Sequence, residues 1–220
     1  MQDIKIKQIK KDFIYVIAFL FIILQFTSLY SNTMKNKAIF TEISKKSGLN
    51  FIHFNGMSGE LYFPEMTGQG GGLFDYDNDG DLDVYLIQGS ILGPGKTLKD
   101  ALFPPKDPNP RDRLFRNDTI KRKGGEIVIK FTDVTDKAGL KMTGYGMGFL
   151  AADFNNDGHV DFYVTNYGPN QMMYNNGDGT FTDISDSSGI SACTGAGMGT
   201  ICGDYDNDGD TDILVANDMT

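Results

Sequence analysis

The stretch that decides the fold is residues 75–83, which read DYDNDGDLD. Aspartates stand at its first, third, fifth and ninth positions, and Gly80 follows the third of them. The pattern returns as DFNNDGHVD at residues 153–161 and as DYDNDGDTD at residues 204–212. Three copies of D-x-[DN]-x-D-G-x-x-D in one chain indicate a repeat protein built around an acidic loop.

This spacing suits a calcium ion. Ca²⁺ takes about 6–8 oxygen ligands in a flexible shell, and closely packed carboxylates repel one another unless a cation lies among them. Positions 1, 3 and 5 of a tight loop turn inward together, the glycine at position 6 permits the turn, position 7 offers its backbone carbonyl, and position 9 closes the shell. The predicted ligands are Asp75, Asp77, Asp79, Asp81 and Asp83; Asp153, Asn155, Asp157, His159 and Asp161; and Asp204, Asp206, Asp208, Asp210 and Asp212.

The loop is not an EF-hand. That loop needs a glutamate at position 12 and flanking helices, whereas this chain has Leu86, Val164 and Val215 there. The segments that follow the loops, VYLI, FYVT and ILVA, are typical of strands, so each loop is expected to join two strands. The simpler alternative is a polar hairpin turn without a metal, and the recurrence of the same positions favours the metal.

A second phrase repeats with the loops. IFTEISKKSGL, KFTDVTDKAGL and TFTDISDSSGI contain Phe40, Phe131 and Phe181, and the last two copies are about 50 residues apart. Each unit is expected to hold a glycine-rich inner strand, the loop, a second strand, a third strand (near QMMYNN in one unit) and the F-T-D strand. Four short antiparallel strands per unit make a propeller blade, so the fold class is all-β, a partial β-propeller of about three four-stranded blades.

The inner strands and the first unit carry two further expectations. Cys202 aligns with Leu73 and Ala151 at a position that is expected to face the core, so a buried thiol is favoured over a disulfide with Cys193. The first unit holds an insert at roughly residues 88–126, where five of the chain's seven prolines lie. Prolines resist regular structure, so the insert is expected to leave one face as an irregular excursion.

Composition and the N-terminus indicate an exported protein. The chain has 220 residues with 20 Lys and Arg against 29 Asp and Glu, and this net charge of −9 argues against a nucleic-acid partner. Lysines at positions 5, 7, 10 and 11 precede an apolar run at residues 13–26. Residues 1–31 are therefore predicted to be a signal peptide or signal anchor, and residues 32–220 the propeller. The expected location is extracellular, cell-surface or periplasmic, with membrane contact only through an uncleaved anchor.

No catalytic constellation is evident. The chain has two histidines, His53 in a strand-like segment and His159 in an acidic loop, and neither can be paired with a serine or cysteine nucleophile. GPGKT at residues 93–97 lacks the first glycine of a phosphate-binding loop, because Ser90 stands in its place. We therefore expect a protein that is not an enzyme.

The three loops, their G-x-G lead-ins and the F-T-D phrases resemble FG-GAP/VCBS repeats, the blades of integrin α-subunit propellers. PEMTGQGGGLFDYDNDGDLDVYLIQGS and RDRLFRND resemble the cartilage acidic protein family, whose members often end in an ASPIC/UnbV domain. The resemblance covers residues 39–220. It implies a propeller of typically seven blades, Ca²⁺ as the cofactor of the loops, and adhesion or ligand binding to a protein or glycan that the sequence does not name.

The chain is short for this family, so we expect an N-terminal fragment, with residues 39–44 forming a lone fourth strand. Two functions remain open. The favoured one is an exported, calcium-stabilised binding module. The alternative is an accessory propeller of an exported enzyme whose catalytic part lies beyond residue 220.

Overall fold

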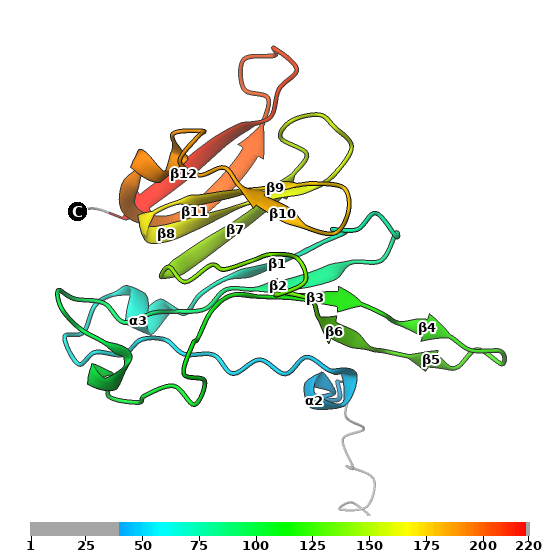
Figure 1. The fold of residues 1–220 in the computed structure, drawn as a ribbon, viewed down its shortest axis with the longest axis horizontal. Coiled ribbons are helices and arrows are strands. Elements are labelled where there is room, and N and C mark those ends of the chain that lie inside the picture. The colour runs from blue at the N-terminus through cyan, green and yellow to red at the C-terminus, as the bar shows by residue number, and fades with distance from the viewer. Residues whose placement is uncertain (1–39, 219–220) are drawn as a thin grey trace, which may run out of the picture. The chain divides into compact units, whose positions relative to one another are not determined.

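The computed structural model describes residues 40–218, which are built almost entirely from antiparallel strands (Figure 1). The chain divides into two units, residues 1–42 and 43–220, and the fold below is that of the second. The signal segment predicted for residues 1–31 lies outside the described residues. Among residues 40–218 no helix is both long and apolar enough to cross a bilayer.

The first blade is a four-stranded antiparallel sheet in the order β1-β2-β3-β6. Its strands are β1 (Gly71–Phe74), β2 (Asp83–Leu86), β3 (Arg113–Asn117) and β6 (Phe131–Asp133). The acidic loop joins β1 to β2, and the F-T-D phrase forms β6, as the repeat pattern predicts.

The second blade repeats this order with more regular strands. Its strands are β7 (Gly146–Ala152), β8 (Asp161–Pro169), β9 (Gln171–Asn175) and β10 (Phe181–Asp183). Each strand pairs antiparallel with the next along the chain. The predictions of a third strand near QMMYNN and of a fourth strand at F-T-D are confirmed.

The third unit has two strands among the described residues, β11 (Thr194–Gly203) and β12 (Asp212–Asp218), after the short 3₁₀ helix η2 (Ile190–Ala192). The expectation of about three four-stranded blades is therefore met by two complete blades and half of a third. The first residues of β11 also pair with the end of β8, which joins the second and third units in one sheet. Within residues 40–218 the sheets do not close into a ring.

The blades pack face to face through aromatic side chains. Phe149 and Phe162 of the second blade lie 4.9 and 4.8 Å, ring centre to ring centre, from Tyr85 of the first. Phe162 in turn meets the edge of Phe181 at 4.9 Å. Tyr85 and Phe162 are fully buried, so these rings form the centre of the shared hydrophobic core.

Glycines let the inner strands approach one another. β1, β7 and β11 lie side by side (Figure 1). The Gly70 N–H donates to the Met147 carbonyl at 2.9 Å, and a Cβ on Gly70 would lie only 2.8 Å from that oxygen. A Cβ on Gly72 would lie 2.0 Å from the Phe149 ring. The close approach at these two positions accounts for the glycine-rich lead-in that the repeat pattern predicts for the inner strands.

The repeated G-x-G is also the site of a β-bulge. The register of β7 on β8 shifts between Gly146 and Gly148, and that of β11 on β12 shifts between Gly197 and Gly199. A bulge places one extra residue on the bulged strand and increases its twist. In β7 and β11 the motif therefore increases the twist of the inner strand about five residues before its acidic loop.

The F-T-D-[IV]-[ST] phrase ties the fourth strand to the third. In the first blade Asp133 Oδ1 accepts from the Thr135 N–H at 3.0 Å and from its hydroxyl at 2.6 Å, and the Thr135 oxygen accepts from the Leu114 N–H at 3.0 Å. The second blade repeats these bonds with Asp183, Ser185 and Met172. The phrase is therefore a buried connection within the blade as well as a strand.

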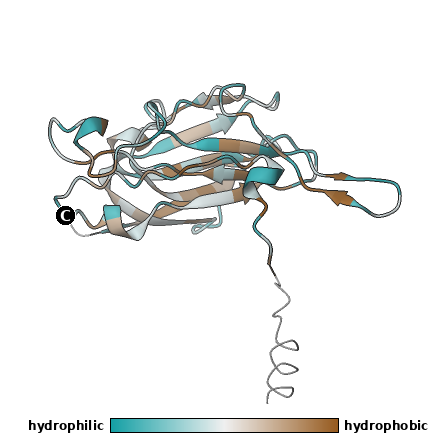
Figure 2. Ribbon diagram, turned by 90° about the horizontal axis from the view of Figure 1, so that it is seen from below, coloured by the Kyte–Doolittle hydropathy of each residue, from teal (hydrophilic) through white to brown (hydrophobic). Residues whose placement is uncertain are grey.

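The insert of the first blade falls into two parts, because β3 lies in the middle of residues 88–126. The first part holds the 3₁₀ helix η1 (Leu98–Asp100) in an otherwise irregular run. The second is the hairpin of β4 (Ile120–Lys121) and β5 (Ile127–Val128), with apolar strands and a polar turn (Figure 2).

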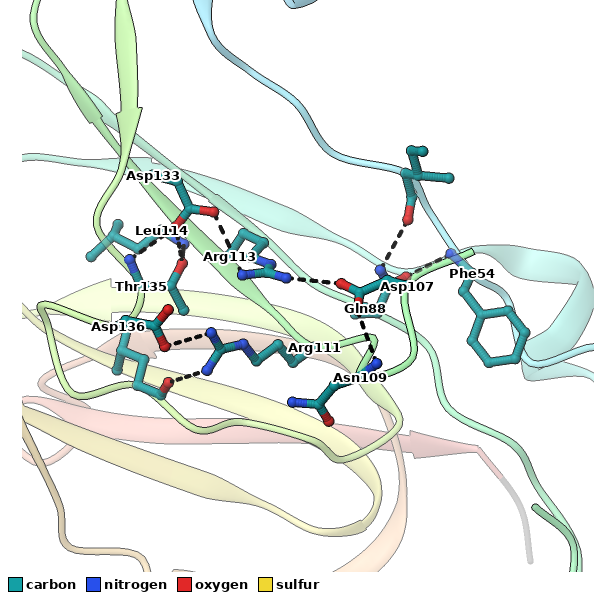
Figure 3. Close-up of polar contacts among 12 residues, drawn as sticks. Phe54, Gln88, Asp107, Asn109, Arg111, Arg113, Leu114, Asp133, Thr135 and Asp136 are labelled. Carbon is teal, nitrogen blue, oxygen red and sulfur yellow. Dashed lines mark hydrogen bonds and ion pairs between the residues drawn. The ribbon is translucent and has the colours of Figure 1, made fainter. Parts of the chain in front are cut away.

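Ion pairs tie the first part of the insert to the blade (Figure 3). Arg113 of β3 lies 2.9 Å from Asp107 in the insert and 3.6 Å from Asp133 in β6. Arg111 lies 2.5 Å from Asp136 and also donates to the Leu140 carbonyl. The Gln88 side-chain oxygen accepts from the Phe54 N–H at 2.6 Å, which ties the segment before the blade to the end of β2.

Two short helices precede the first blade, α2 (Ser44–Ser47) and α3 (Pro64–Thr67). α2 ends at Gly48, whose φ of 96° only glycine adopts readily. The strand expected at residues 39–44 is not present in its described part, because residues 41–43 are irregular and α2 begins at Ser44. A strand needs a hydrogen-bonding neighbour, and none of the described strands pairs with this segment.

The core-facing position predicted for Leu73, Ala151 and Cys202 is only partly buried. Ala151 packs against the shared core, but Leu73 is 63% exposed. This face of each inner strand packs on the preceding blade, and β1 is the first inner strand of the described chain. Cys193 is exposed, Cys202 is half-buried, and both thiols are free.

Candidate metal centres

The three acidic loops follow the same backbone path, and each joins the first and second strands of its unit. Asn78, at position 4, has a φ of 57°, and Gly80, at position 6, has a φ of 90°. The other two loops repeat this with Asn156 and Asn207 at 57° and 60° and with Gly158 and Gly209 at 89° and 95°. Left-handed conformations at both positions explain why asparagine and glycine recur there.

The aspartate at position 1 shapes the loop through backbone hydrogen bonds. Asp75 Oδ1 accepts from the Asp79 N–H at 3.0 Å, and its Oδ2 accepts from the Gly80 N–H at 2.9 Å. Asp153 and Asp204 make the same pair of bonds in their loops. Each loop is therefore folded around its first carboxylate, which lies at the centre of the turn.

The aspartate at position 9 is buried beneath the first and second loops, and its equivalent in the third, Asp212, is half-buried. Asp83 and Asp161 are fully buried, and Asp83 accepts from the Tyr76 N–H at 3.0 Å and from the Asn117 N–H at 2.7 Å. Burial raises the pKa of Asp83 to about 6, although these two N–H donors act in the opposite direction. Burial also raises the pKa of Asp161. An ionised carboxylate in this position is poorly solvated and would be stabilised by a nearby cation.

Carboxylates converge in the first and third loops. Asp75, Asp77 and Asp83 each place an oxygen within 4.8 Å of the others, and so do Asp204, Asp206 and Asp212. Within the described residues, Asp77 Oδ1 is buried and has no hydrogen-bond partner. Burial and the nearby Asp79 raise the pKa of Asp77, and the guanidinium of Arg116 lowers it. A buried carboxylate oxygen without a hydrogen-bond donor fits the role of a cation ligand.

The second loop has a weaker set of metal-ligand oxygens. Asn155 stands where the other loops have an aspartate, and its side chain both accepts from the Asp157 N–H and donates to Asp157 Oδ2. The hydrogen bond from the His159 N–H lowers the pKa of Asp157, and the Asn155 amide adds to this. This loop therefore holds one negative charge fewer than its neighbours near the centre of the turn.

The predicted ligands at positions 5 and 7 lie at the exposed rim. Asp79 Oδ1 accepts from the Asp81 N–H at 2.9 Å, and Asp157 and Asp208 accept in the same way from His159 and Asp210. The structure thus brings positions 1, 3 and 9 together in the first and third loops. Positions 5 and 7 are held beside them by the backbone.

This donor set fits a hard divalent cation. The first and second loops combine a buried carboxylate with rim oxygens, and the third offers mostly exposed oxygens. Ca²⁺ accepts such irregular shells of carboxylate, amide and carbonyl oxygens. In the first loop Asp75, Asp77 and Asp83 would hold the ion, and Asp79 and the carbonyl of Asp81 would complete its shell. The backbone N–H bonds at positions 1 and 9 use only part of each carboxylate's accepting capacity.

A second feature, which the sequence reasoning missed, is a pocket beside the insert. It has a volume of about 310 Å³ and lies between residues 50–54 and residues 103–113. Its lining includes the exposed ring of Phe103, together with His53 and Lys106. Burial lowers the pKa of His53, which therefore favours the neutral ring. The cluster of prolines in the insert was the available signal, because it marks a long ordered excursion over a blade.

Residues 153–215, which run from the second acidic loop into β12, match the family model described as FG-GAP-like repeat. The chain contains an FG-GAP-like repeat. The matched region holds both the second and the third acidic loop, so the repeat includes the two loops and the blade between them. The resemblance stated from the motifs is confirmed for this part of the chain.

Curated relatives agree with this repeat. The chain is 33% identical over 91 residues to cartilage acidic protein 1 of Xenopus tropicalis. This match covers 41% of this chain and 14% of the relative. It is 31% identical over 107 residues to cartilage acidic protein 1 of Homo sapiens, which covers 48% of this chain and 16% of the relative. The match therefore represents a small share of those longer proteins and supports the repeat rather than their whole activity.

Proposed function

We propose that this chain is a non-catalytic binding module of an exported protein, and that Ca²⁺ ions in its acidic loops hold one edge of its blades in place. The FG-GAP-like repeat supports the binding module. The observation that carries the calcium proposal is the first loop, where three carboxylates converge and Asp77 Oδ1 is buried without a partner.

Calcium would act here as a structural ion. Each loop carries several negative charges at the junction of two strands, and Asp83 and Asp161 also bind the third strand through its N–H groups. A bound cation would remove the repulsion within the loop and would favour the ionised form of the buried carboxylate. The loop would then connect the first three strands of a blade as a rigid unit.

The partner that we propose is a protein or glycan. The insert pocket offers a concave, partly aromatic surface for such a ligand, since aromatic rings bury large area at low entropic cost.

Calorimetric titration of the full chain with Ca²⁺ tests the metal. We expect saturable binding at millimolar or lower calcium. Asp77→Ala should remove one site and leave the others, because the other loops keep their ligands. Asp186→Ala, an exposed aspartate outside the loops, is the matched control and should bind like the wild type. The absence of any saturable binding by the wild type would refute the calcium proposal.

Retention of the full chain on glycan arrays and matrix-protein arrays tests the binding role. Retention that falls in the Phe103→Ala variant would place the ligand at the insert pocket. Leu102→Ala is the control, since Leu102 is also an exposed apolar residue of the insert but does not line the pocket. Equal retention of wild type and Phe103→Ala would remove the pocket as the site.

A further inference from the structure

The asparagine at position 4 has no place in the metal shell, yet it recurs in all three loops. The ligand positions are 1, 3, 5, 7 and 9, so the side chains of Asn78, Asn156 and Asn207 are not among the oxygens expected at the ion. Their left-handed backbone explains why a non-branched polar residue is tolerated. It does not explain why glycine, which suits that conformation better, is absent.

The structure supplies a second role for the side chain. The Asn78 amide nitrogen donates to the Gly158 carbonyl of the second loop at 3.1 Å and lies 3.0 Å from Nδ1 of His159. The Asn156 amide nitrogen donates to Asp210 Oδ1 of the third loop at 3.1 Å. Position 4 of the first loop thus contacts positions 6 and 7 of the second, and position 4 of the second loop contacts position 7 of the third.

These contacts are made to the part of the next loop that holds its position-7 ligand. Gly158 and His159 form the turn that would present the position-7 carbonyl of the second loop. The His159 ring is confined on its other side, because a Cβ on Gly177 would lie 2.5 Å from its Nε2. Asp210 is the position-7 residue of the third loop. An ion that orders one loop therefore also orders the side-chain amide of its position-4 asparagine. That amide restrains the turn around position 7 of the next loop.

The second loop gains most from such support. Its central position has the neutral Asn155 in place of an aspartate, so its attraction for a cation is the weakest of the three. It is also the loop that receives a contact from the first and gives one to the third. A pre-ordered turn reduces the entropy lost on binding and thereby raises affinity.

We propose that the position-4 asparagine is a positioning residue that couples neighbouring calcium loops, so that filling one loop raises the affinity of the next. This rests on the proposed calcium binding. One exposed hydrogen bond supports a coupling of roughly three- to tenfold in affinity. By thermodynamic reciprocity, filling the second loop raises the affinity of the first by the same factor.

The test uses Asn78→Gly in the full chain. Glycine keeps the left-handed backbone and removes only the amide, so the loop should fold as before. Asn207→Gly is the matched control, because Asn207 has the same position and φ but makes no hydrogen bond to another loop within residues 40–218. Ca²⁺ titrations followed through the Gly158 and Gly209 amide signals by NMR report the second and third loops separately.

We expect Asn78→Gly to weaken calcium binding at the second loop three- to tenfold, and Asn207→Gly to leave it unchanged. Asp77→Ala, which disables the first loop, should weaken the second loop by a similar factor in the wild type and by nothing further in Asn78→Gly.

The outcomes separate the two proposals. Suppose that the wild type binds calcium in all three loops, and that the calcium affinity of the second loop is unchanged in both Asn78→Gly and Asp77→Ala. That result would overturn the coupling and leave calcium binding intact. If the Gly80, Gly158 and Gly209 signals of the wild type all stay unchanged when calcium is added, both proposals fail. Equal weakening by Asn78→Gly and Asn207→Gly would also overturn the coupling, because the effect would then belong to the backbone.

Discussion

At the scale of single residues, the buried carboxyl of Asp112 is the clearest case of a charge held in an unfavourable environment outside the loops. Asp112 accepts from the Tyr85 hydroxyl at 2.8 Å and from the Gln88 N–H at 2.7 Å. Burial raises its pKa to about 7 in spite of these donors. The same burial, with the nearby Asp112 charge, raises the pKa of Tyr85, so the phenol stays protonated.

The raised pKa makes a pH-dependence prediction. The folded chain binds the Asp112 proton more tightly than the unfolded chain, so its stabilisation is complete below about pH 4 and is lost as the pH rises through about 7. Between pH 5 and 8 this should cost about 2.5 kcal/mol of the free energy of unfolding. In Asp112→Asn this part of the pH dependence should be absent.

Urea unfolding in the presence of a chelator measures this pH dependence of the free energy of unfolding. The chelator excludes metal bound to the loop carboxylates, whose own raised pKa values contribute equally to both proteins. The comparison is therefore the difference between wild type and Asp112→Asn at the two pH values. Parallel pH profiles for the two proteins would show that Asp112 titrates normally.

Residue types and spacing predicted that positions 1, 3, 5 and 9 of every loop turn inward. The structure brings positions 1, 3 and 9 together in the first and third loops, and spacing did not indicate the behaviour of each oxygen. Asp75 and Asp83 are largely satisfied by backbone N–H groups, whereas Asp77 Oδ1 is not. Spacing along the chain carries no information on which donors the third strand supplies. The contacts of Asn78 and Asn156 were missed for the same reason, because they join segments about 80 and 54 residues apart.

At the scale of the elements, strand order and strand type could be predicted because each unit repeats the same local pattern. The phrase F-T-D-[IV]-[ST] is expected from the repeat to form the fourth strand, and its hydrogen bonds to the third strand show a more specific role. The insert was predicted as one excursion, but RLFRN lies within it as β3. Five residues between two loops give too short a pattern to separate a blade strand from an insert.

The phrase makes a prediction about Thr135. Thr135→Val keeps the shape of the side chain but leaves the buried Leu114 N–H without its acceptor, so we expect a loss of about 1–3 kcal/mol in the free energy of unfolding. Thr200→Val is the control, because the Thr200 hydroxyl is buried without a partner in the described residues. That variant should be neutral or more stable in the same urea titration, and similar losses in both variants would contradict the role of the Thr135 bond.

At the scale of the whole molecule, the repeat also explains which surfaces are covered. Tyr76 and Tyr85 of the first unit are 3% and 0% exposed, because the second blade packs on them. Their equivalents in the third unit, Tyr205 and Leu214, are 82% and 70% exposed. The sequence has apolar residues at these positions in both the first and the third unit. A blade buries such residues only against a neighbouring blade, because it cannot cover its own sides. Whether these residues are buried depends on the presence of the next blade, which the residues of one repeat do not reveal.

The exposed face of the third unit should therefore associate with apolar surfaces. Ile201 and Leu214 lie on it, and a patch of this kind promotes self-association of the full chain as its concentration rises. Placing a lysine at both positions should shift the weight-average mass in sedimentation equilibrium towards the monomer, because burying a charge against an apolar partner is costly. Leu102→Lys, at an exposed apolar residue of the insert, is the matched control and should leave the mass unchanged. If the double variant and the control associate like the wild type, this face does not drive association, and another exposed surface such as the β4–β5 hairpin must do so.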